Sequence, residues 1–172
     1  MPKPVEKNSE LDQATLRLTV SACALLYIVV LASLHPGDAT SYVPIIVYIV
    51  TFIVASVFLR MIIKRWPGHF FWRRLFSMLH DYTGIAFAMV LGGESALPIY
   101  AALLWVTLGN GMRFGSRYLA LATVIALSTL VLVFWLNPFW HTQPYMFLMV
   151  IVTTIVVPAY AHILLKLSLI HI

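Results

Sequence analysis

Long apolar runs separated by short polar breaks dominate the pattern of this chain. Most of the runs are long enough to cross a hydrocarbon core about 30 Å thick as a helix, whereas the fourth is unusually short. The pattern predicts six transmembrane helices, with a five-span alternative in which the third and fourth runs count as one element. The runs cover approximately residues 14–34, 42–63, 75–91, 96–108, 118–136 and 144–166.

Composition agrees with a membrane protein and predicts an all-α fold. Of the 172 residues, 62% are hydrophobic and 10% are charged, whereas soluble domains carry about a quarter charged residues. Backbone groups in lipid are satisfied only within helices or closed barrels, and the chain lacks the alternating pattern of barrel strands. We therefore expect a polytopic helix bundle over 14–166, preceded by a juxtamembrane segment over 1–13. Residues 167–172, LSLIHI, resemble translated sequencing-adapter sequence, which predicts a non-native tail.

The basic residues predict the orientation. With six spans, all 11 Lys and Arg residues fall on one side of the membrane, which places both termini in the cytoplasm. They form no continuous stripe, so the formal net charge of +5 does not indicate nucleic-acid binding. Residues 69–78, HFFWRRLFSM, favour an interfacial helix with Arg73 and Arg74 at anionic headgroups.

Polar residues in or beside the third and fourth runs are candidates for function, because such groups are costly in lipid. They are His80, Asp81 and, outside the third run, Glu94 and Asn110. A hairpin folded at Gly92-Gly93 brings Asp81 opposite the fourth run, and a glycine-rich connection over 109–115 then supplies Arg113 as its charge partner. Two interpretations remain open: a structural pair of Asp81 with Arg113 or Asn110, or a switch. Glu94 is either solvated or contacts a ligand headgroup.

Catalytic and metal motifs are missing from the sequence. No HExxH, GxSxG or Walker-type pattern occurs. A b-type haem between His80 and His162, or between His35 and His141, is conceivable, but histidine pairs at similar depth arise easily by chance. We expect no catalytic residue, no metal and no cofactor in this segment.

One string carries a family resemblance. LWVTLGNGMRFGSRYL, over 104–119, resembles the membrane input region of RpfC-type hybrid sensor histidine kinases, which are bacterial receptors for diffusible signal factors, the cis-2-unsaturated fatty acids. NSELDQATLRL, over 8–18, is similar to the juxtamembrane segment of that family. The resemblance implies that Ser9, Glu10 and Gln13 take part in signal binding.

The resemblance also implies a protein truncated before its kinase domain, so this fragment is not an enzyme although its parent is a histidine kinase. It further implies a bacterial inner-membrane location, a fatty-acid signal, a homodimer formed through the parent kinase, and a signal synthase as partner. A bound carboxylate would meet Arg17, Asn110 or Arg113. The main alternative is a small transporter that uses Asp81 and His80 as a proton relay; a structural scaffold is the third.

Overall fold

Every element of the computed structural model is a helix, and no strand occurs among the residues that the structure describes, which are 9–34, 39–66, 68, 70–92, 94 and 97–170. This confirms the predicted all-α fold class. The chain forms two compact units, Met1–Arg74 and Leu75–Ile172.

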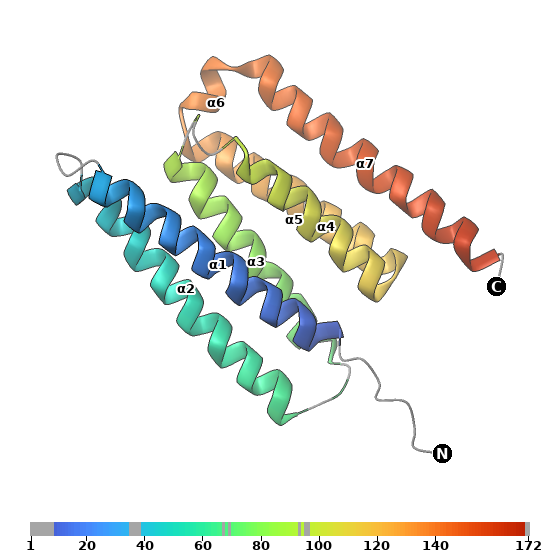
Figure 1. Ribbon diagram of the computed structural model, residues 1–172. Coiled ribbons are helices and arrows are strands. Elements are labelled where there is room, and N and C mark those ends of the chain that lie inside the picture. The colour runs from blue at the N-terminus through green and yellow to red at the C-terminus, as the bar shows by residue number, and fades with distance from the viewer. Residues whose placement is uncertain are drawn as a thin grey trace. The chain divides into compact units, whose positions relative to one another are not determined.

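The first unit is a pair of long helices, α1 (Ser9–Leu34) and α2 (Ala39–Arg65), which run side by side (Figure 1). Near the start of α1, Ala14 is completely buried and packs with Leu59 and Ile63 of α2. Many of the other large apolar side chains on both helices are exposed. Helices that are apolar on all sides and remain exposed are typical of membrane spans.

The second unit holds most of α3 (Phe71–Gly92), followed by α4 (Ile99–Phe114), α5 (Ser116–Leu136), the short α6 (Phe139–Thr142) and α7 (Pro144–Ile170). Helices α4 and α5 lie side by side, and α5 also packs against α7 (Figure 1). Their buried core contains Tyr82, Ile85, Met89, Leu103, Ala126, Leu130, Val133, Trp140 and Val150.

Asn137 connects the end of α5 to the end of α3. Its Nδ2 donates to the carbonyl oxygens of Met89 at 3.2 Å and Val90 at 2.9 Å. The last carbonyl groups of a helix lack partners within the helix. Asn137 therefore supplies donors that the last turns of α3 would otherwise obtain only from water, which is absent from a hydrocarbon core.

Among the residues that the structure describes, five helices are long and apolar enough to cross a membrane: α1, α2, α3, α5 and α7. Helix α4 has 16 residues, which corresponds to about 24 Å and falls short of a hydrocarbon core about 30 Å thick. The third and fourth runs nevertheless form two separate helices. The polytopic helical membrane architecture is confirmed, whereas the span number and the side of each terminus stay predictions.

The predicted helix over 69–78 is helical from Phe71 and belongs to a longer helix, whereas its position at the membrane interface stays a prediction. Residues Phe71–Gly92 form one continuous helix that includes both arginines. The segment contains no proline, and its first glycine is Gly84. Nothing in its backbone chemistry therefore stops the helix between the aromatic and the apolar parts.

The expectation of a glycine-rich connection over 109–115 is wrong, because α4 continues through Phe114 and only Gly115 interrupts the helix. Gly115 has φ +93°, in the region that favours glycine. Gly111 lies within the helix, where a Cβ would come within 2.7 Å of the Leu119 side chain. The glycine thus permits close packing of α4 on α5, as small residues do in membrane helices.

Candidate functional site

A buried polar network joins three helices of the second unit. The Tyr82 hydroxyl of α3 lies 2.7 Å from Thr107 Oγ1 of α4 and donates to the Ala122 carbonyl of α5 at 3.1 Å. Thr107 also donates to the Leu103 carbonyl of its own helix at 2.7 Å. Hydrogen bonds between helices contribute to association in lipid, where apolar burial gives no advantage over the lipid tails. The network therefore fixes the mutual positions of α3, α4 and α5.

Asn110 lies one turn beyond Thr107 on α4 and is 0% exposed. Its Nδ2 donates to the Val106 carbonyl of the same helix at 2.8 Å, and the predicted hydrogen bond with Asp81 stays a prediction. Its buried Oδ1 has no hydrogen-bond partner among the residues described. A buried acceptor without a partner costs about 1–3 kcal/mol, so this point of the core favours an arriving donor.

Helix α4 is also hydrogen-bonded to the last helix. The Tyr100 hydroxyl donates to the Val150 carbonyl of α7 at 2.8 Å and lies 3.0 Å from Thr154 Oγ1. Thr154 is fully buried and bonds back to the Val150 carbonyl at 2.7 Å. Helix α4 therefore has polar contacts with α3 and α7, and a movement of α4 disturbs both.

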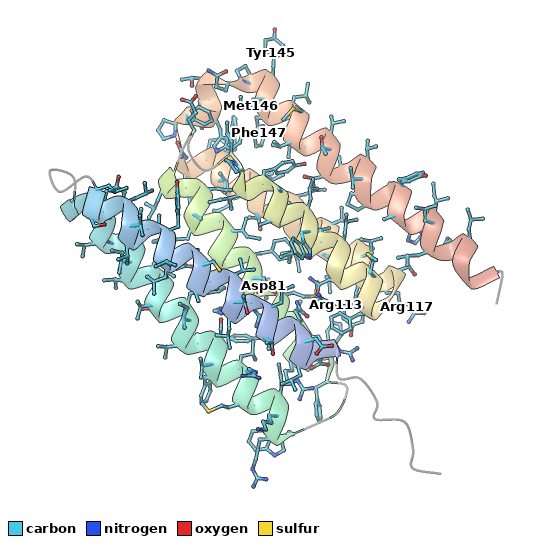
Figure 2. The ribbon with its side chains drawn as sticks, in the orientation of Figure 1. Asp81, Arg113, Arg117, Tyr145, Met146 and Phe147 are labelled. Carbon is cyan, nitrogen blue, oxygen red and sulfur yellow. The ribbon has the colours of Figure 1, made fainter. Side chains whose placement is uncertain are left out.

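Asp81 lies next to Tyr82 on α3 and is buried. Figure 2 labels Asp81 and, on α4 and α5, Arg113 and Arg117. His80 is half-buried, and its carbonyl accepts a hydrogen bond from Thr83 at 2.8 Å. Arg113 is exposed and lies beside Gly109 of its own helix. The pairing of Asp81 with Arg113 stays a prediction.

Two other predicted residues lie in or beside connections. Glu94, between α3 and α4, is exposed, and its carbonyl accepts a hydrogen bond from Leu97. His141 stacks on Phe134, with 4.4 Å between the ring centroids, and its Nε2 lies 2.7 Å from the Phe134 carbonyl. His35 lies outside the described residues. The described contacts of His141 are thus local ones at the α5–α6 corner.

A second polar cluster lies in the first unit, around Glu10 of α1. Glu10 is 6% exposed. Its Oε2 accepts from Arg73 Nε at 2.9 Å and Nη2 at 2.6 Å, and its Oε1 accepts from Arg74 Nε at 2.6 Å. Arg73 also donates to the carbonyls of Trp66, at 2.6 Å, and Gly68. Hydrogen bonds between ionised partners are about twice as strong as neutral ones.

This cluster gives Arg73 and Arg74 a partner within the protein, whereas their predicted position at anionic headgroups stays a prediction. Within Met1–Arg74, both arginines bind the carboxylate of Glu10. A buried carboxylate requires cationic partners, because an uncompensated charge is expensive to bury. The arginines thus attach the start of α3 to α1, and Arg73 also reaches carbonyls just beyond α2.

The other juxtamembrane candidates share the buried side of α1. Gln13 and Arg17 are buried, at spacings of three and seven residues from Glu10, which places all three on one helix face. Ser9 is the first residue of α1, and its side chain lies outside what the structure describes. The structure therefore brings Glu10, Gln13 and Arg17 to one face of the helix.

The hydroxyl groups of Tyr82, Tyr100 and Thr107 were not among the site residues predicted from the sequence. A signal for them was present, since each is a polar group inside an apolar run of a predicted span. Such residues commonly form hydrogen bonds between membrane helices. Attention to charged residues and amides alone overlooked the contacts through which α4 binds its neighbours.

Comparisons with known proteins support one of the predicted interpretations. No protein-family model and no solved structure matches the chain. It is 40% identical over 94 residues to the sensory/regulatory protein RpfC of Xanthomonas campestris pv. campestris, in strain ATCC 33913 and in strain 8004. The match covers 55% of this chain, and the chain covers 13% of each relative.

The bacterial relatives and the five apolar helices together confirm the predicted location in a bacterial inner membrane. Over more than half of its length, this chain is thus similar to the sensory/regulatory protein RpfC, which confirms the resemblance to an RpfC-type membrane region that its motifs predicted.

Proposed function

We propose that this chain is the membrane input region of a two-component receptor that detects a fatty-acid signal and relays it to a histidine kinase in the parent protein. The observation that carries the proposal is the 40% identity to a sensory/regulatory protein over 94 residues. The same similarity does not favour a transporter with Asp81 and His80 as a proton relay. The chain itself supplies input, and the parent supplies catalysis.

Helix α3 offers a route for the signal. Its first turns carry Arg73 and Arg74, which bind Glu10, and the same continuous helix carries Tyr82, which contacts α4 and α5. A ligand that changes the Glu10 contacts would therefore act on α3, and through the polar network on α4. Ligand binding shifts such an equilibrium only by its difference in affinity for the two states.

The last step of the proposed signal relay runs from α4 to α7. Tyr100 connects α4 with Val150 and Thr154, so a displaced α4 strains or breaks these contacts. Helix α7 is the last of the chain, and in the proposal it leads to the kinase. Small shifts of packed helices are a common form of transmembrane switching, because packed interfaces have discrete arrangements.

The proposed ligand site lies on the face of α1 that carries Glu10, Gln13 and Arg17, beside Ser9. A fatty-acid carboxylate is repelled by Glu10 and competes with it for Arg73 or Arg74. Each buried CH₂ of the acyl chain contributes about 0.8 kcal/mol. The charged head and the apolar tail of such a signal thus match the two chemistries found at this end of α1.

The proposal includes six spans with both termini in the cytoplasm, and α4 as a short fourth span held by its neighbours. All 11 basic residues then lie on the cytoplasmic side. It also includes a homodimer formed through the parent kinase and contact with a signal synthase.

Two variants of the full-length receptor test the switch. Asp81→Asn removes the charge beside Tyr82, and Tyr100→Phe removes the contacts with α7. We expect both to alter autophosphorylation as a function of added fatty-acid signal. Tyr145→Phe is the matched control, since Tyr145 is exposed and points away from the helices (Figure 2). Dose-response curves identical to wild type in both test variants would contradict the proposal.

A further inference from the structure

The two faces of α4 divide the motif W-V-T-L-G-N-G-M-R-F-G, over 105–115, into residues with different surroundings. On the inner face, Asn110 is fully buried and Gly111 approaches Leu119 of α5. On the outer face, Trp105 is 59% exposed and Met112 is 74% exposed. The inner residues are accounted for by helix packing. The outer residues are not, and they include the cation Arg113.

The outer face has a notch at Gly109. A Cβ built on this glycine would lie 3.9 Å from Trp105 Nε1 and 3.9 Å from Arg113 Nη1. The indole N–H and the guanidinium are both hydrogen-bond donors and neither accepts a hydrogen bond. Because Gly109 has no side chain, two donors lie around a space that any other residue would occupy.

An apolar groove continues from the notch along α4. It is lined by Ala101, Leu104, Leu108 and Met112, together with the three notch residues. No carboxylate is among the lining residues, so the charge of the groove comes from Arg113. Arg117 lies nearby at the α4–α5 junction (Figure 2). The groove therefore matches a molecule with an anionic head and an apolar tail.

We propose that the notch at Gly109 binds the phosphate of an anionic phospholipid, with one acyl chain lying along the groove. Guanidinium groups bind phosphate through two parallel hydrogen bonds, and the Trp105 indole supplies a further donor. Tryptophan and arginine both favour the boundary between hydrocarbon and headgroups. This inference does not depend on the receptor function, since a lipid at this groove would stabilise α4 in any membrane protein.

Native mass spectrometry of the full chain tests the proposal with two lipids of identical acyl chains, phosphatidylglycerol and phosphatidylcholine. We expect phosphatidylglycerol to be retained in preference. Gly109→Ala fills the notch, and Arg113→Gln removes the cation. Each should lower phosphatidylglycerol retention about tenfold, as expected for the loss of a charged hydrogen bond.

The substitutions can be separated from misfolding. The nearest neighbour of a Cβ at Gly109 is 3.7 Å away, an ordinary contact, so Gly109→Ala retains the helical circular-dichroism spectrum. Arg117→Gln is the matched control, because Arg117 does not line the groove. A loss in Arg117→Gln equal to that in Arg113→Gln would indicate general charge attraction and would contradict binding at the notch. Equal retention of both lipids, or preferential retention of a free fatty acid offered in their place, would contradict the proposal that the ligand is an anionic phospholipid.

Discussion

Gly109 and Gly111 are two residues apart on α4 but have different neighbours. A Cβ at Gly111 would lie 2.7 Å from both Cβ and Cδ1 of Leu119, whereas the closest atom to a Cβ at Gly109 is 3.7 Å away. The first separation is too short for any real pair of carbon atoms, and the second is ordinary van der Waals contact. Helix packing thus requires a glycine at position 111, whereas the space beside Gly109 is available to the proposed phospholipid.

Gly111→Ala should destabilise the contact of α4 with α5, because the helices must separate to admit a methyl group. We expect the free energy of unfolding to fall by about 1–3 kcal/mol, the usual cost of overpacking. Unfolding of the purified chain in increasing SDS, followed by circular dichroism, measures this. Gly109→Ala is the control and should unfold no more easily than wild type, since alanine is favoured over glycine inside a helix. Equal stability of the two variants would show that Leu119 moves aside without cost.

At the scale of elements, Glu10 connects α1 with the start of α3 and, through Arg73, with the segment after α2. It binds Arg73 and Arg74 at the start of α3, and Arg73 in turn donates to the carbonyls of Trp66 and Gly68 beyond the end of α2. Carbonyls at the end of a helix need such external donors. The carboxylate of α1 thus determines how the chain passes from α2 into α3.

Glu10→Gln should loosen this passage, because two arginines lose their anionic partner. Asp12→Asn changes the charge of the same helix equally, but Asp12 is exposed. Limited trypsin digestion in detergent, analysed by mass spectrometry, should show faster cleavage after Arg73 and Arg74 in Glu10→Gln than in Asp12→Asn. If the two variants are cleaved at the same rate, the ion pairs of Glu10 with Arg73 and Arg74 do not protect the start of α3 from cleavage.

At the scale of the whole molecule, α4 is the shortest of the main helices and yet contacts α3 and α7 through hydroxyl groups. Its 16 residues leave it below the length of an ordinary span. A helix surrounded by neighbours can remain in the bilayer despite its length, because they cover its ends. The number of membrane spans then depends on whether α4 crosses the bilayer.

Cysteine labelling measures the span number. Cys23 is the single cysteine, so Cys23→Ala gives a background without thiols into which Asp12→Cys, Glu94→Cys and Lys166→Cys are placed singly. A membrane-impermeant maleimide added to intact spheroplasts should label only the variant at position 94. Both others should react after permeabilisation, as expected for six spans with cytoplasmic termini. Reaction of positions 12 and 166 from opposite sides would mean an odd number of spans.

Helix positions were largely predictable, because uninterrupted apolar runs in lipid can satisfy their backbone groups only as helices. The predicted run over 118–136 agrees with α5 at Ser116–Leu136, and the break after Gly92 agrees with the end of α3. The prediction failed where local chemistry was ambiguous. Glycines over 109–115 suggested a connection, but all except Gly115 lie in the helix.

The sequence by itself determined the membrane location, the helical class and the identity of the unusual polar residues, since each follows from the cost of placing a group in lipid. Only the tertiary structure decided the partners: that Glu10 binds Arg73 and Arg74, that Tyr82 meets Thr107, and that Gly109 and Gly111 face different surroundings. The physical reason is that the cost of a buried polar group is local to its residue, whereas its hydrogen bond needs an atom from a segment distant in the chain.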